Sequence, residues 1–190
     1  MSTSQTGSTF SRISAVAWTV VPITWMTAAV LERGRDWEGL PSAVWGIGWL
    51  ALVVAGAATV MAVVRTRDRT DRRGLRRGGI AAMGAGLAVS AIAPWAIPVW
   101  SALYGVAMLL VAASGRGGAA ARLTGFAFLA AVGSLIVLTA LRVGTPDSFG
   151  NRPVAWTVAT IIATVGAAGG MVVWPSGAPS SVETRSAAVA

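Results

Sequence analysis

The chain has 190 residues, of which 55% are hydrophobic and only 12% are charged, with 15 basic side chains against 7 acidic ones. A soluble domain carries about 25% charged residues, so this composition and a mean hydropathy of +0.68 indicate a membrane protein. All 15 basic residues are Arg, and the absence of Lys, His and Cys excludes Schiff-base, haem-ligating, thiolate and Ser–His chemistry.

Uncharged runs near the N-terminus predict the first two transmembrane helices. A hydrocarbon core of about 30 Å needs about 20 apolar helical residues. Residues 13–31 and 43–64 are uncharged runs of this length, and both have charged residues at their ends. Residues 1–11 are rich in Ser and Thr, so we expect a disordered cytoplasmic tail before a transmembrane domain of residues 12–174.

A longer uncharged run, residues 79–113, predicts two helices rather than one. As a single helix its 35 residues would extend about 52 Å, well beyond one crossing. Pro94 and Pro98 near its middle predict a tight turn between a helix over 78–93 and another over 96–113. The first of these is short and rich in Ala and Gly, which leaves a re-entrant segment, and therefore five spans, as the alternative.

The C-terminal half contains two further uncharged runs. Residues 123–141 and 153–174 predict the last two spans, the second of which opens with Pro in its first turn. Residues 175–190 are expected to form a disordered cytoplasmic tail. The predicted fold is an all-α integral membrane protein, a bundle of six transmembrane helices.

The densest charge lies between the second and third predicted spans. This 13-residue segment contains two Asp and seven Arg, namely Arg65, Arg67, Arg69, Arg72, Arg73, Arg76 and Arg77. Arg accumulates in cytoplasmic loops, so we expect both termini inside the cytoplasmic membrane of a bacterium with a GC-rich genome. The segment is also expected to contact anionic lipid headgroups. Nucleic acid is not an expected partner, because no aromatic side chain interleaves the Arg residues to stack on bases.

Tryptophan is unevenly distributed between the two predicted faces. Only Trp18 and Trp174 are expected toward the cytoplasm, and the other seven of nine lie toward the outer side. This asymmetry suggests a pocket for an apolar ligand, lined by Trp25, Trp45, Trp49, Trp95, Trp100, Tyr104 and Trp156. An aromatic belt that anchors the helix ends is the simpler interpretation of the same pattern.

Polar side chains within the predicted spans are limited to Ser, Thr, Tyr and Trp. An ion-coupled carrier normally has ionisable residues there, so their absence from the sequence of the spans argues against that class. We expect the hydroxyl groups to bond carbonyl groups of their own helices. Small residues at four-residue spacing, such as Gly166 and Gly170 or Ala82 and Gly86, predict close helix packing.

These patterns favour a protein without enzymatic activity, cofactor or metal ion. The most economical hypothesis is an accessory or scaffold subunit that contacts another membrane protein. The alternative is a binding or permeation protein for a small apolar or lipid-like solute, which would use the Trp-rich outer pocket.

Overall fold

The structure, a computed structural model, describes residues 3–31, 40–65, 72–94, 96–115, 117–141 and 154–174, which form helices and short turns and contain no strand. Its six helices are α1 (Thr3–Leu31), α2 (Leu40–Arg65), α3 (Arg73–Ile92), α4 (Ile97–Ala113), α5 (Gly118–Ala140) and α6 (Val154–Val172). The predictions of an all-helical chain and of six helices are therefore confirmed.

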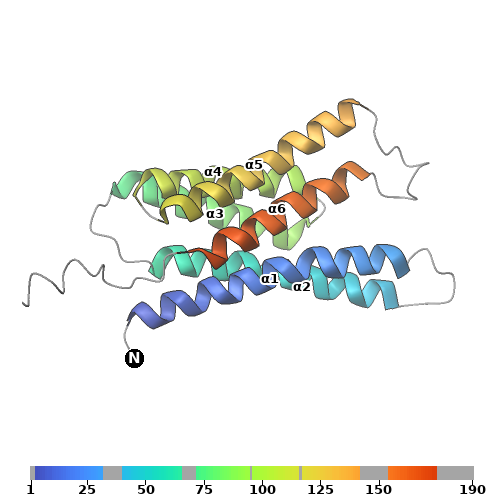
Figure 1. Cartoon of the computed structure of the whole chain (residues 1–190), viewed down its shortest axis with the longest axis horizontal. Helices are drawn as coiled ribbons and strands as arrows, with labels where there is room; N and C mark the ends of the chain where they lie inside the picture. Colours follow the sequence, from blue (N-terminus) through green and yellow to red (C-terminus); the bar gives the residue numbers. More distant parts are fainter. Residues whose placement is uncertain are drawn as a thin grey trace, which may run out of the picture.

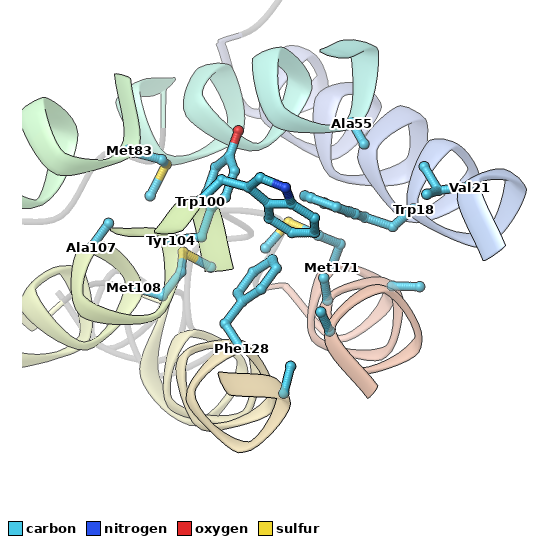
Figure 2. Packing of buried hydrophobic residues seen from close by; sticks show 14 of the residues in the cluster. Trp18, Val21, Ala55, Met83, Trp100, Tyr104, Ala107, Met108, Phe128 and Met171 are labelled. Carbon is cyan, nitrogen blue, oxygen red and sulfur yellow. The ribbon is translucent and has the colours of Figure 1, made fainter. Parts of the chain in front are cut away.

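The six helices lie lengthwise beside one another (Figure 1), and their contacts close a ring in chain order. Each helix packs against the helices before and after it, and α6 returns to pack against α1. Successive helices run in opposite directions, as short connections in a bundle require. Side chains from all around the ring meet at its centre (Figure 2).

The two ends of the ring differ in charge. The Arg residues within the described ranges all lie at or near the end where α1 begins and α2 ends, called here the arginine end: Arg12, Arg65, Arg72, Arg73, Arg76, Arg77 and Arg122. The same ranges contain no Asp or Glu. The described part of the molecule is therefore strongly basic at one end and uncharged along its length.

The expectation of a disordered tail over residues 1–11 is wrong for residues 3–11, because α1 begins at Thr3. Ser11 is buried, and the Arg65 guanidinium lies 4.6 Å from the centroid of the Phe10 ring. This cation–π contact and the burial hold the first turns of α1 against the end of α2. Residues 175–190, the other predicted tail, lie outside the described residues.

The third helix begins earlier than its uncharged run. It starts at Arg73 rather than near residue 78, since Arg favours helix and the basic segment continues the same hydrogen-bonded ladder. At its other end the chain reverses between Ile92 and Ile97. The Trp100 indole donates a hydrogen bond of 3.1 Å to the Pro94 carbonyl, which fixes the turn to the start of α4.

Glycine brings α5 and α6 close together. A Cβ atom added at Gly166 would collide with Ala127, and one added at Gly170 would collide with Thr124. The predicted close packing at this GxxxG pair is therefore confirmed, and α5 is the partner helix. Glycine also permits close approach of α4 and α5, because Gly105 and Gly125 each lie near the other's backbone carbonyl.

Two helical segments are long and apolar enough to cross a membrane, Ser42–Arg65 and Gly118–Ala140. Only 28% of the most apolar stretch of the second is buried, whereas a core helix of a soluble protein would be mostly buried. Ile97–Ala113 and Trp156–Val172 are apolar but shorter. Length and composition thus identify two candidate spans among the described residues.

Adjacent glycines in α6 offer a test of the packing. Gly170 faces Thr124 and the Ala120 carbonyl, whereas Gly169 has open space around it. Gly169→Ala should raise the free energy of unfolding by about 0.5–1 kcal/mol through helix propensity. Gly170→Ala should lower it by about 1–3 kcal/mol through overpacking. Thermal unfolding in detergent, followed by circular dichroism, measures both; shifts of the same sign would contradict the close contact.

Candidate functional site

Four aromatic side chains, called here the aromatic cluster, fill the centre of the ring (Figure 2). Trp18 comes from α1, Trp100 and Tyr104 from α4, and Phe128 from α5, and all four are fully buried. The Tyr104 and Phe128 rings stack with centroids 5.3 Å apart. Trp18 meets both edge-on at 5.8 and 5.4 Å, and Trp100 meets both edge-on at 6.5 and 6.4 Å. Such geometries are favoured by the ring quadrupoles, so the cluster is a specific packing unit.

Methionine side chains complete the packing around the aromatic cluster. Met83, Met108 and Met171 come from α3, α4 and α6, and each is buried in the same core (Figure 2). Their flexible thioethers fill irregular gaps beside aromatic rings. The centre of the ring is therefore occupied by side chains that pack against one another.

A polar contact joins α1 to α2 beside the aromatic cluster. Thr59 Oγ1 donates to the Ala55 carbonyl at 2.7 Å, accepts from Trp18 Nε1 at 3.0 Å and lies 2.6 Å from Ser14 Oγ. Ser14 Oγ lies 3.2 Å from the same carbonyl oxygen, but because Thr59 already donates to that oxygen, Ser14 donates its proton to Thr59 Oγ1. We call Ser14, Trp18 and Thr59 the α1–α2 clasp. Its buried polar atoms satisfy one another, as buried hydrogen-bonding groups generally must.

Most other hydroxyl groups in the helices bond within their own helix, as expected. Thr19, Thr24, Thr27, Thr160 and Thr164 each donate to the carbonyl four residues earlier. These bonds satisfy the hydroxyl groups locally, without a ligand or a neighbouring helix.

Two buried hydroxyl groups lack a hydrogen-bond partner among the described residues, those of Tyr104 and Ser101. The Tyr104 hydroxyl lies over Gly56 of α2, where a Cβ atom would collide with it. Ser90 is its polar neighbour, but Ser90 Oγ donates to the Leu87 carbonyl at 2.9 Å. The position of Tyr104 is therefore set by packing of its ring, since Gly56 provides the space for its hydroxyl.

The residues that were predicted to line one pocket lie in different surroundings in the structure. Trp100 and Tyr104 belong to the aromatic cluster, whereas Trp25 and Trp45 contact each other with centroids 5.6 Å apart. Trp49 is 42% exposed, and its indole donates to the Ala91 carbonyl of α3 at 3.0 Å.

The remaining predicted pocket residues are described only in part. Trp156 is partly buried against the core, and Trp95 lies outside the described residues. The sequence did not single out Phe128, and it placed Trp18 on the opposite side from Trp100. The structure instead packs Trp18 and Trp100 against the same two rings.

An apolar groove of about 430 Å³ runs along the outer side of α1 and α2, called here the α1–α2 groove. It is lined by Arg12, Ile13, Val16, Ala17, Val20, Ala51 and Val54. None of the predicted Trp residues that the structure describes lines it. The sequence carries one signal of its existence, which is the small size of Ala17 and Ala51, one on each helix.

The predicted Arg contact segment is partly described. Arg65, Arg72, Arg76 and Arg77 lie at the arginine end, whereas residues 66–71, which include Arg67 and Arg69, fall outside the described ranges. The Arg73 backbone opens α3. The described Arg side chains thus surround the end of the ring at which Arg12 opens the α1–α2 groove.

Comparison with known protein families, with curated proteins and with solved structures gives no match to this chain. Its functional interpretation therefore depends on its own residues and geometry.

The α1–α2 clasp predicts a specific loss of stability. Thr59→Val keeps the side-chain shape but removes the acceptor of the Trp18 indole, and should lower the free energy of unfolding by about 1–3 kcal/mol. Thr27→Val is the matched control, because Thr27 is exposed and donates to Ile23 of its own helix, and should change stability by less than about 0.5 kcal/mol. Detergent unfolding followed by Trp fluorescence compares the two.

A double-mutant cycle with Trp18→Phe extends this test. Once the indole N–H is gone, Thr59→Val should cost less than it does in the original chain. Additive losses would show that the hydrogen bond between Trp18 and Thr59 contributes nothing to stability.

Proposed function

We propose that the chain is a six-span protein of the cytoplasmic membrane whose role is non-catalytic, as an accessory or scaffold subunit for another membrane protein. The observation that carries this proposal is that apolar side chains lie on the outside of the ring as well as at its centre. Large apolar groups cover the outside of the ring, and its centre is filled by the aromatic cluster.

The outer surface supports insertion in a bilayer. Val16 of α1, Leu50 of α2 and Ile136 of α5 are 65%, 59% and 64% exposed. Exposed apolar side chains that continue along several helices are typical of contact with lipid or another apolar surface. The 17 residues of α4 extend about 26 Å, a length that a bilayer accommodates by slight thinning.

The arginine end supports the orientation. Positive side chains near span ends accumulate on the cytoplasmic side, so this end is assigned to the cytoplasm and both termini with it. Uncharged helices lead away from it, and the acidic residues of the sequence fall between or beyond the described helices. The sequence between α2 and α3 adds Arg67 and Arg69, which favour the same orientation.

A non-catalytic role agrees with the chemistry of the ring interior. The described polar groups at its centre are indole and hydroxyl groups, and most of them are engaged in hydrogen bonds. General acid–base catalysis needs a group that titrates near neutral pH, and such groups are missing from the sequence of the spans. Filled space at the centre likewise favours a structural role over passage of a solute.

Cysteine labelling tests the six-span topology. The chain has no Cys, so Ser148→Cys and Thr70→Cys each provide a single reactive thiol. An impermeant thiol reagent applied to intact cells should label Ser148→Cys and spare Thr70→Cys until the cells are permeabilised. Labelling of Thr70→Cys in intact cells would reverse the orientation, and protection of both would favour five spans.

Co-purification tests the accessory role. Affinity purification in mild detergent should recover a second membrane protein in constant ratio to the chain. Gly84 of α3 and Gly133 of α5 both face open space, so Gly84→Leu and Gly133→Leu form a matched pair for locating the contact. We expect Gly84→Leu to reduce recovery, because the outward side of α3 carries small residues that let another helix approach. Recovery of a lipid-like small molecule without a protein partner would favour the solute-binding alternative.

A further inference from the structure

We propose that the α1–α2 groove binds one anionic phospholipid, with an acyl chain lying along the groove and the phosphate paired with Arg12. The inference rests on the membrane insertion proposed above. It assigns a defined lipid site outside the Arg65–Arg77 segment, for which the sequence predicts only general headgroup contact.

The shape of the groove fits a hydrocarbon chain. Ala17 and Ala51, both poorly exposed, lie between the larger Val16 and Val54 side chains, which are 65% and 41% exposed. From Arg12 to Val20 the groove follows about 12 Å of α1, parallel to the direction in which lipid chains lie. Its volume of about 430 Å³ falls in the range of small-molecule sites.

The charge at one end of the groove fits a phosphate group. Among the described residues, Arg12 is the one charged residue that lines the groove, and it directly precedes the uncharged run that begins at Ile13. The guanidinium is thus placed at headgroup depth, and its planar fork matches phosphate oxygens. Among the described residues, none forms an ion pair or hydrogen bond with the Arg12 side chain, whereas Arg65 nearby is engaged with Phe10.

The surroundings favour an anionic lipid over a zwitterionic one. Arg12 shares its end of the ring with six other described Arg residues, and the sequence between α2 and α3 adds two Arg and two Asp, so the positive charges remain in excess. A zwitterionic headgroup brings its own cation next to the phosphate and would be repelled in part. Each Arg near the surface adds an attraction that corresponds to about a fivefold preference for anionic lipid.

Native mass spectrometry of the detergent-purified full chain tests the site. Phosphatidylglycerol and phosphatidylcholine are titrated separately, and binding of the first lipid molecule is quantified. Arg12→Gln should weaken first-molecule binding of phosphatidylglycerol about fivefold and that of phosphatidylcholine by less. Arg122→Gln is the control, because Arg122 is exposed at the same end on α5 and does not line the groove.

A second pair of variants tests the groove itself. Ala51→Leu places a larger side chain in the groove and should abolish the first binding event for phosphatidylglycerol. Ala130→Leu, on an exposed position of α5, should leave it intact. Circular dichroism confirms that each variant retains the helical content of the original chain.

The outcomes separate this inference from the proposed function. Equal weakening by Arg12→Gln and Arg122→Gln would overturn the site, because the attraction would then be a property of the whole arginine end. Undiminished binding to a folded Ala51→Leu variant would also overturn it. Recovery of the original chain in the soluble fraction of cells, rather than in the membrane fraction, would instead contradict the membrane insertion on which the site depends.

Discussion

The contact of Trp18 with Tyr104 and Phe128 is the constraint on which the ring depends. Neighbouring helices in the ring touch along their sides, whereas α1 reaches across the centre to α4 and α5 through these rings. Six helices arranged in a circle leave space at the centre, and helices of Ala and Val alone would not fill it. Large rigid side chains from opposite sides close that space at the density of a protein interior.

Close helix approach and large central side chains depend on each other. Glycine at the α5–α6 and α4–α5 contacts brings backbones together at the perimeter, where Gly170 and Gly105 accept no Cβ without displacement of a neighbour. Within a bilayer the association of helices draws on dispersion and hydrogen bonding more than on the hydrophobic effect. Tight perimeter contacts bring the aromatic rings into contact at the centre, and the rings in turn fix the spacing of the perimeter.

The number of helices could be predicted because charge and proline delimit them. Uncharged runs locate four helices, and the Pro94–Pro98 segment divides the longest run into two more. The starts of α1 and α3 could not be predicted in the same way, since both helices continue beyond the uncharged residues. A helix can continue beyond its apolar run when contacts such as that of Phe10 with Arg65 stabilise the additional turns.

The central site was harder to predict than the fold. The position of a residue along a predicted helix can be counted from the charged residues at the helix ends. The direction in which its side chain points around the helix axis can be predicted only when one face of the helix is polar. Helices that are apolar on every side lack such a face. Trp18 and Trp100 therefore looked like residues of opposite interfaces, although both turn inward to the same pair of rings. No sequence pattern around Phe128 predicts its central position, which is identified only from its contacts in the structure.

The contact between α1 and α6 has a consequence for the order of assembly. These are the first and last helices of the described residues, so the ring stays an open arc until α6 has been synthesised and packed. The Ser14 and Thr59 hydroxyl groups can meet as soon as α2 emerges, which shields the polar edge of the Trp18 indole early. The remaining face of that indole becomes buried when α4 and α5 pack against it, and α6 then packs against α1 and closes the ring. A chain that stopped after α5 would retain the clasp and the aromatic contacts but leave the ring open between α1 and α5.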